Sequence, residues 1–259
     1  MSSRERIYRV EAIVLRRVDF GEADRLLTVF TPDRGKLRLI AKGARKPSSR
    51  KSGHVELFTH DQFLVTAGRE LDIIIQAETA EAFLPLREDL LRTTYAYYVA
   101  ELADAFSAER DENQPLFYLL RDTLSWLCTA DDLALLARYY ELRLLGVVGY
   151  QPQLFLCGNC RRELGPGVHY LAAGEGSVLC PQCGRDRAGT VGISANALKV
   201  LRFLQTHDWE ICRLVRLSSP IHAEIERTMR HYLFYHLERK LKSVDLIHHL
   251  RRQMEMNQV

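Results

Sequence analysis

Residues 34–51 read RGKLRLIAKGARKPSSRK, and this stretch predicts a β-strand followed by a charged loop. In residues 36–42 (KLRLIAK), apolar and basic residues alternate with the two-residue period of a strand. That period places Leu37, Leu39 and Ala41 on the side of a core and the basic side chains on the opposite side. The stretch therefore predicts a sheet with one buried face and one cationic face.

The same stretch concentrates positive charge. It carries eight Lys and Arg residues and no Asp or Glu, whereas the net charge of the whole chain is only +3. Residues 43–53 continue this charge on a backbone rich in Gly, Pro and Ser, which is typical of a flexible loop. Such a run favours a polyanion such as nucleic acid, and a solvated loop without a partner is the alternative. The residues expected to contact phosphates are Arg16, Arg17, Arg34, Lys36, Arg38, Lys42, Arg45, Lys46, Arg50 and Lys51.

Five segments before residue 80 are rich in aliphatic and aromatic residues, and turn residues separate them. These predicted strands span residues 11–17, 26–31, 36–41, 55–66 and 71–77. In the last strand the odd-numbered residues Leu71, Ile73 and Ile75 are apolar, so we expect them to face the core. Five strands with one long basic connection predict a small Greek-key barrel of the oligonucleotide-binding (OB) type. An SH3-like barrel would have almost the same sequence pattern.

Two Cys-x-x-Cys pairs lie in the middle of the chain, Cys157 with Cys160 and Cys180 with Cys183. Each pair can hold one metal ion through two thiolates. Four thiolates at this spacing are typical of a structural Zn²⁺ site, which is tetrahedral and has no open position. Free or redox-active cysteines and an iron–sulfur cluster are the alternatives. His169 lies between the pairs, and we expect it to be a surface residue rather than a ligand.

Beyond residue 85 the apolar residues recur at helical spacing. The predicted helices span residues 87–110, 116–128, 132–145, 195–205 and 221–242. We therefore expect an α+β fold with four parts, and the two helical parts are expected to form one bundle. The parts are an OB-fold barrel (1–80), a first helical part (81–150), a zinc-finger insertion (151–190) and a second helical part (191–259).

The last predicted helix carries four basic residues, Arg227, Arg230, Arg239 and Lys240. These charges form either a solvated helix face or a second contact with nucleic acid.

The composition, 47% hydrophobic and 27% charged, is that of a folded globular protein. No apolar run approaches the length of a membrane span, and the N-terminus lacks the apolar core of a signal peptide, so we expect a cytoplasmic protein. The sequence contains no Walker loop, nucleophile elbow, dinucleotide glycine motif or His-Glu-x-x-His helix. We therefore expect a binding protein and not an enzyme.

Six blocks of the chain, together with the two Cys pairs, resemble the RecO family of bacterial DNA repair proteins. The blocks are EAIVL (11–15), GEADR (21–25), TPDRG (31–35), AKGAR (41–45), YELRLL (140–145) and GYQP (149–152). The resemblance implies an OB barrel followed by a helical domain that contains a zinc finger. It further implies a recombination mediator without catalytic turnover, which binds single- and double-stranded DNA and anneals complementary strands.

The resemblance also implies partners. RecO-like proteins act with RecR to load RecA onto strands covered by the single-strand binding protein (SSB), and they contact the acidic C-terminal tail of SSB. The implied location is the cytoplasm, in association with the nucleoid. The implied zinc ligands are Cys157, Cys160, Cys180 and Cys183.

The basic run contains no aromatic residue, so we expect phosphate-dominated binding with little base preference. Bases would have to stack on Phe20, Phe30, Phe58 or Phe63, and we expect each of these to lie in the barrel core. Two other functions agree with the same residues. One is a protein-interaction adapter for an acidic partner, and the other is an RNA-binding zinc-ribbon protein of transcription or translation.

Overall fold

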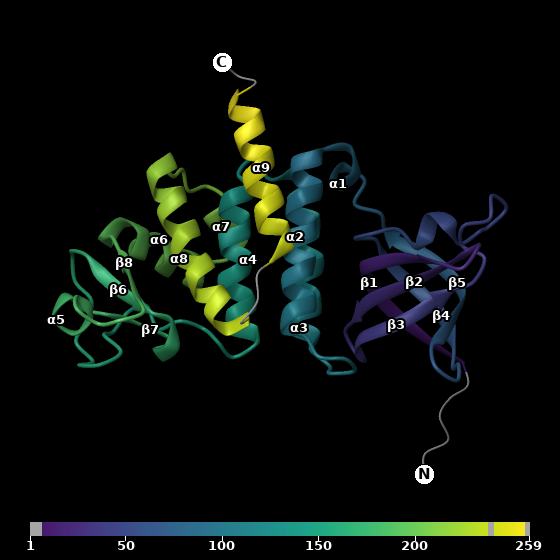
Figure 1. Ribbon diagram of the computed structural model, residues 1–259, viewed down its shortest axis with the longest axis horizontal. Helices are drawn as coiled ribbons and strands as arrows, with labels where there is room; N and C mark the ends of the chain where they lie inside the picture. The colour runs from purple at the N-terminus through teal and green to yellow at the C-terminus, as the bar shows by residue number, and fades with distance from the viewer. Residues whose placement is uncertain (1–6, 238–240, 257–259) are drawn as a thin grey trace, which may run out of the picture. The chain divides into compact units, whose positions relative to one another are not determined.

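The computed structural model of the chain describes residues 7–237 and 241–256 (Figure 1). The chain divides into two compact units, one made of residues 1–129 and 241–259 and the other of residues 130–240. Among the described helices, none is both long enough and apolar enough to cross a membrane. The four domain bounds expected from the sequence stay predictions.

The first unit begins with a closed barrel of five strands. The strands are β1 (Ile7–Phe20), β2 (Asp24–Thr31), β3 (Gly35–Ala41), β4 (His60–Thr66) and β5 (Asp72–Glu81). Their order around the barrel is β1-β2-β3-β5-β4, and β4 closes the barrel by pairing with β1. β3 and β5 are parallel, while the other neighbours are antiparallel. This arrangement confirms the predicted OB-type barrel.

Strand β3 has the alternation that its sequence predicts. Leu37, Leu39 and Ala41 are buried in the barrel core, whereas Arg38 and Lys42 are exposed. The same core contains apolar residues from all five strands. The barrel therefore has its basic side chains on the outer face of β3, as the sequence predicts.

The hairpin between β2 and β3 is fixed by Thr31 and Gly35. The Thr31 hydroxyl donates a hydrogen bond to the Gly35 carbonyl (2.8 Å) and accepts one from the Arg34 amide (3.2 Å). Gly35 has a φ of +62°, in the left-handed region that favours glycine. This turn sets the register in which β3 pairs with β2.

The fourth strand begins later than the sequence predicts. It starts at His60 rather than at residue 55, because Phe58 has a φ of +66°, which interrupts an extended chain. The Phe58 amide donates to the Val14 carbonyl (2.9 Å), so the chain at this point approaches β1 before regular pairing begins.

The predicted core face of the last strand is also wrong. Ile74 is fully buried, whereas Ile75 is 45% exposed. The pairing of β4 with β5 shifts register between Leu64 and Val65. Since side chains alternate every second residue, a one-residue shift exchanges the inner and outer faces of a strand.

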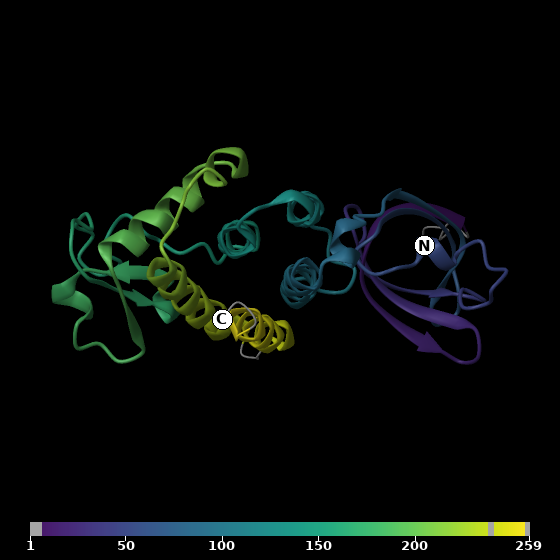
Figure 2. The ribbon, with the colours of Figure 1, turned by 90° about the horizontal axis from the view of Figure 1, so that it is seen from above.

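Four helices complete the first unit. They are α1 (Pro85–Glu88), α2 (Leu90–Phe106), α3 (Gln114–Thr129) and α9 (Lys242–Met256). The sequence predicts one helix where α1 and α2 are separate, because Asp89 adopts an extended conformation and its side chain caps α2 by accepting from the Arg92 amide (2.9 Å). α2 lies beside both α3 and α9 (Figures 1 and 2). Glu101 of α2 accepts hydrogen bonds from the Lys242 and Ser243 amides and so caps the start of α9.

The second unit combines helices with a small sheet. Its main helices are α4 (Leu133–Val147), α6 (Ala195–Thr206), α7 (Trp209–Cys212) and α8 (Ser219–Leu237). The sheet consists of β6 (His169–Ala172), β7 (Ser177–Leu179) and β8 (Thr190–Ile193), in the order β7-β6-β8. α4 precedes the sheet in sequence and packs against α6 and α8, which follow it. Helices on the two sides of the insertion therefore pack together, as expected, but α9 packs with α2 in the first unit.

The last predicted helix, residues 221–242, corresponds to α8, which ends at Leu237. α9 begins at Lys242 and is not among the predicted helices. Arg239 and Lys240, two of the predicted basic residues, lie outside the described residues. Of that set, the structure describes Arg227 and Arg230, and both are exposed on α8.

Candidate nucleic-acid interface and metal centre

The outer face of β1, β2 and β3 places two arginines in one row. Thr28 of β2 pairs with Arg16 on one side and with Arg38 on the other, so the two arginines flank it on the same face. A groove of about 420 Å³ runs over this face. It is lined by Arg16, Val18, Leu26, Leu27, Thr28, Lys36, Arg38, Leu39, Leu71, Asp104 and Glu109.

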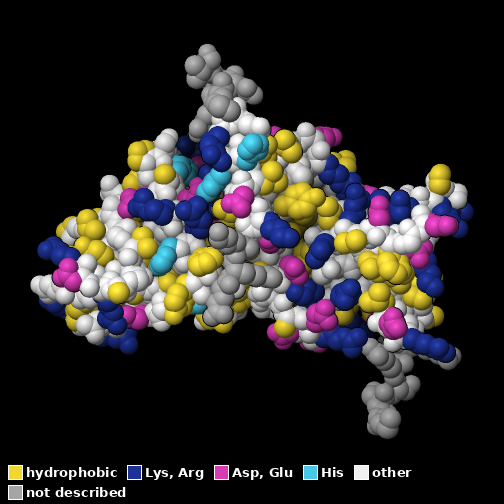
Figure 3. Space-filling view, in the orientation of Figure 1, with side chains coloured by type: hydrophobic (Ala, Val, Ile, Leu, Met, Phe, Trp, Pro, Cys, Tyr) yellow, Lys and Arg dark blue, Asp and Glu magenta, His cyan; other side chains and the backbone are white. Residues whose placement is uncertain are grey.

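The next row of the same face is apolar. Leu26 pairs with Val18 on one side and with Ile40 on the other. Val18 is 48% exposed, so the row is open to a ligand. The barrel side of Figure 3 carries apolar side chains (yellow) next to Lys and Arg (dark blue). The face therefore joins cations to an apolar strip that was not predicted, although Val18 and Phe20 alternate with Arg17 and Asp19 in the sequence.

One of the four candidate stacking residues is accessible. Phe30, Phe58 and Phe63 are buried, as expected. Phe20 is 52% exposed, and the expectation that it lies in the core is wrong. It lies at the end of β1, where the ribbon formed with β2 extends beyond the core residues, so no layer covers it.

The ten predicted phosphate ligands divide into two sets. Five are exposed, and their side chains make no hydrogen bond or ion pair with any described residue. This free set consists of Arg16, Arg38, Lys42, Lys46 and Arg50. Free cations on one sheet face and the adjoining loop produce a local positive potential that attracts a polyanion.

Lys36 belongs to the engaged set. Its Nζ donates to the Asp104 carboxylate (2.7 Å), the Asp104 carbonyl (2.8 Å) and the Ser107 carbonyl (2.9 Å). These acceptors lie at the C-terminus of α2, where the helix dipole also favours a cation. In this structure Lys36 thus joins the barrel to α2.

The other four members of the engaged set also bind protein groups. Arg17 forms an ion pair with Glu56, and the Arg34 guanidinium lies over the Tyr8 ring, 4.3 Å from its centroid. Arg45 lies 3.4 Å from an Asp19 carboxylate oxygen, and Lys51 donates to the Ile74 carbonyl (3.1 Å). Their role as phosphate ligands stays a prediction.

The basic loop is attached to the barrel at several points. Ala44 is buried in the barrel core, and the Arg45 amide donates to the Ala23 carbonyl (2.9 Å). Farther along, His54 Nδ1 lies 2.8 Å from the Thr79 hydroxyl, which donates to the Asp61 carboxylate (2.5 Å). These anchors hold the loop cations next to the sheet face.

Asp61 is fully buried beneath this loop. Burial raises its pKa to about 6, even though the Thr59 and Thr79 hydroxyls favour the charged form. Its second carboxylate oxygen has no partner among the described residues. The ionised form of Asp61 is therefore costly at neutral pH.

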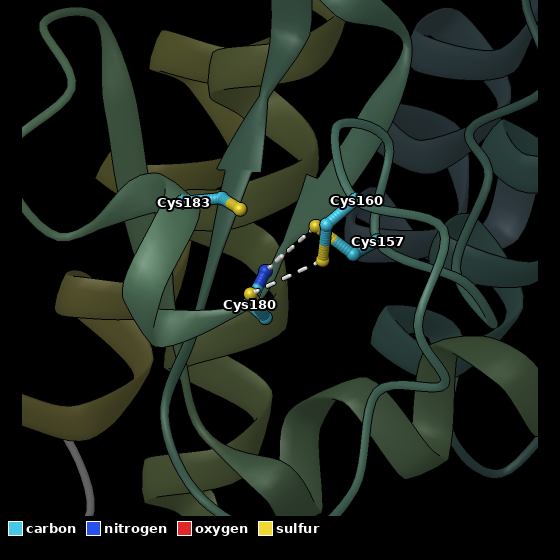
Figure 4. Close-up of side chains that lie close together, drawn as sticks. All are labelled: Cys157, Cys160, Cys180 and Cys183. Atoms are coloured by element: carbon cyan, nitrogen blue, oxygen red, sulfur yellow. Dashed lines mark hydrogen bonds between the residues drawn. The ribbon is translucent and has the colours of Figure 1, made fainter.

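The four cysteines of the second unit come together, as Figure 4 shows. Their sulfur atoms all lie within 4.8 Å of one another, and the Cys160 and Cys180 sulfurs are 3.8 Å apart. Four sulfurs at 2.3 Å from a tetrahedral Zn²⁺ would be about 3.8 Å apart. The cluster can therefore hold a metal ion, and its geometry fits zinc.

Hydrogen bonds to sulfur support this donor set. The Cys180 amide donates to Cys157 Sγ (3.3 Å), and Arg162 Nε donates to Cys160 Sγ (3.4 Å). The Arg162 bond is the main cause that lowers the pKa of Cys160 to about 6. Donors of this kind stabilise the thiolates that a metal requires.

His169 is not a surface residue, and that expectation is wrong. It is 2% exposed, and its Nε2 lies 2.7 Å from the Gly165 carbonyl. Its place on β6 faces the interior of the ribbon, so it contributes to packing. It is not a member of the cysteine cluster.

Comparisons with known proteins identify the family. The model of the Recombination protein O N terminal matches residues 1–83, and the model of the Recombination protein O C terminal matches residues 87–245. Together these matches span the barrel, the helices α2 to α8 and the cysteine ribbon.

Individual relatives agree with the family models. The chain is 42% identical to the DNA repair protein RecO of Roseiflexus sp. (strain RS-1) over 252 residues, which cover 97% of this chain and 88% of that protein. It is 39% identical to the DNA repair protein RecO of Desulforamulus reducens over 247 residues, 95% of each chain. It is 40% identical to the protein of the same name from Pelotomaculum thermopropionicum, over 92% of each chain. With its two family models, its OB barrel and these relatives, the chain belongs to the RecO family of DNA repair proteins.

Proposed function

We propose that the protein is a recombination mediator that binds single- and double-stranded DNA and anneals complementary strands. The observation that carries the proposal is the free set of cations, Arg16, Arg38, Lys42, Lys46 and Arg50. These side chains line one face of the barrel and the loop beside it, and no acidic partner among the described residues neutralises them. Phosphates are the ligands that such a surface binds with little regard to sequence.

The sheet face gives a strand both charge and an apolar surface. Arg16 and Arg38 lie on one side of the row formed by Val18, Leu26 and Ile40. Of these residues, all but Ile40 line the groove. Phosphates bound at the arginines bring the bases of a single strand close to the apolar row. Exposed Phe20 adds one ring on which a base can stack.

The cysteine cluster has a structural role in this proposal. Cys157, Cys160, Cys180 and Cys183 would hold one Zn²⁺ and leave no ligand position open for a substrate. When bound, the ion joins the loop that carries the first pair to α5 (Pro181–Gly184), which carries Cys183. It thereby stabilises a ribbon whose three strands are only three or four residues long.

The family supports the rest of the proposal. We infer that the protein acts without catalytic turnover, in the cytoplasm at the nucleoid, and that RecR and the acidic C-terminal tail of SSB are its protein partners. Through them it helps to load RecA onto SSB-coated DNA. Membership of a DNA repair family is the ground for these partners.

Annealing of SSB-coated complementary strands tests the proposal. Lys46→Glu reverses a free cation of the loop, and Arg69→Glu makes the same charge change at an exposed arginine between β4 and β5. We expect Lys46→Glu to slow annealing and to weaken binding to single strands, while Arg69→Glu resembles the wild type. Equal annealing by both variants would remove the loop from the mechanism, and a wild type that binds no DNA would refute the proposal as a whole.

A further inference from the structure

The second unit contains a cationic stripe on α8. Arg227, Arg230 and Phe234 are exposed and are spaced at i, i+3 and i+7, which places them on one side of the helix. The opposite side of α8 is packed in the core through Ile225 and Met229. The three exposed residues form what we call the α8 stripe.

The two arginines of the stripe have no partner among the described residues. Some arginines of this unit are engaged, since Arg213 pairs with Glu210 and Arg143 donates to the His207 carbonyl, whereas Arg161 and Arg185 are exposed like those of the stripe. Glu224, the acid nearest the start of α8, does not reach the stripe, because its carboxylate accepts from the amide (2.6 Å) and the hydroxyl (2.7 Å) of Ser194. Glu226 lies about 100° around the helix from Arg227 but only about 40° from Arg230, one turn before it, and no hydrogen bond or ion pair joins it to either arginine. The stripe therefore carries two positive charges with one carboxylate at its edge.

Phe234 adds an aromatic ring to these charges. Its side chain is 50% exposed, next to Arg230 on the following turn of the helix. An exposed ring beside guanidinium groups matches single-stranded nucleic acid, in which phosphates alternate with flat bases. From Arg227 to Phe234 the helix rises about 10 Å, the length of about three nucleotides stacked 3.4 Å apart.

We propose that the α8 stripe is a second site for a single nucleic-acid strand, separate from the barrel. This inference rests on the proposed function, because it assumes that the barrel holds a first strand. Annealing requires two strands on one protein, and a stripe on a different element can hold the second strand while the barrel keeps the first. Contacts with phosphates and one stacked base bind any sequence and leave the remaining bases free to pair.

Capture of a second strand tests the stripe with the full-length protein. The protein is first bound to an immobilised oligo(dT), and a labelled oligo(dT), which cannot pair with it, is then added at increasing salt concentrations. Arg227→Ala with Arg230→Ala is expected to lower the salt slope of second-strand capture by about 1.4, at about 0.7 for each phosphate contact with a single strand. Phe234→Ala is expected to weaken capture about fivefold or more.

Two controls keep the test decisive. Lys199→Glu changes the net charge by the same two units as the double Ala variant, at an exposed lysine on α6, and is expected to capture the second strand like the wild type. All variants should bind the first strand normally and unfold at the wild-type temperature. If the double variant captures the second strand normally, or if Lys199→Glu loses capture equally, the proposal is overturned.

Two further outcomes have distinct meanings. A wild type that fails to bind the first strand refutes the proposed function and not the stripe alone. Loss of binding to poly-glutamate by the double variant, with second-strand capture intact, would assign the stripe to an acidic protein and would also overturn the proposal.

Discussion

Replacing Lys36 and Lys42 separately by Met tests whether DNA is held by the free cations alone. Both lysines belong to the same basic run, and Met keeps most of the apolar stem while it removes the charge. Lys36 makes three contacts with the C-terminus of α2, whereas Lys42 is exposed and contacts no charged group of the described chain. The structure therefore predicts that the same substitution weakens DNA binding at Lys42 and lowers the stability of the fold at Lys36.

The expected magnitudes follow from these contacts. Five free cations on a single strand give a slope of log K against log salt of about −3.5, at about 0.7 per contact. Lys42→Met should reduce this slope to about −2.8 and change the free energy of unfolding by less than about 0.5 kcal/mol. Lys36→Met should leave the slope unchanged. It should lower the free energy of unfolding by about 1–3 kcal/mol, because the Asp104 carboxylate and two carbonyls lose their donor.

Fluorescence anisotropy with labelled oligo(dT), measured over a range of salt concentrations, gives the slopes, and urea denaturation gives the free energies of unfolding. Arg69→Met serves as the control for removal of an exposed charge elsewhere in the barrel. If Lys36→Met reduced the slope as much as Lys42→Met, Lys36 would leave α2 to bind phosphate. The division into free and engaged cations would then be refuted.

Three further predictions concern the buried carboxyl, the metal cluster and the exposed ring. The folded-state pKa of Asp61, about 6, lies above its usual value of 3.8, so its contribution to stability is lost as pH rises through this window. Between pH 4 and pH 7 the wild type should therefore lose about 2 kcal/mol more of its free energy of unfolding than Asp61→Asn does, as measured by urea denaturation. Parallel pH profiles of the free energy of unfolding for variant and wild type would contradict this. Cys160→Ser should abolish binding of one zinc ion per chain, measured by atomic spectrometry, and expose the ribbon amides to hydrogen exchange. The slope of DNA binding against salt should stay at its wild-type value. Ribbon amides that are equally protected without zinc would argue against a structural metal. Phe20→Ala should weaken binding to single strands by about 1 kcal/mol or more but leave duplex binding unchanged, since duplex bases are already stacked. Ile75→Ala, which truncates an exposed apolar residue of β5, is the control. An equal loss of binding to duplex DNA in Phe20→Ala would exclude stacking.

Local patterns in the sequence were sufficient to predict several elements. The alternation of Leu37, Arg38 and Leu39 predicts the inner and outer faces of β3 because side-chain direction in a strand follows directly from position. The cysteine spacing predicts the cluster because each pair needs only a short turn to bring two sulfurs to one ion. In these cases the interacting groups are close together in the sequence.

Long-range contacts explain most of what the sequence did not predict. The sequence pattern predicts Lys36 as a phosphate ligand, but in the fold its Nζ contacts Asp104 of α2, which lies 68 residues away in the sequence. Ile74 faces the core because of a register shift in the pairing with β4, and the sequence of β5 alone does not predict this shift. Phe20 resembles a core residue in composition, but β1 extends beyond the barrel core at this point. In each case a partner element decides the environment.

The apolar row of the barrel is compatible with annealing only if it binds bases weakly. Bases that stack on Phe20 or lie against Val18 are hidden from a complementary strand, so the row opposes pairing. One stacked base contributes about 1–3 kcal/mol, whereas each step of a DNA duplex contributes about 1.4 kcal/mol on average. Two or three base pairs therefore suffice to withdraw a strand from the row, while the phosphates can stay on Arg16 and Arg38. A face with a single exposed ring and free cations can thus hold a strand and still release its bases to a partner.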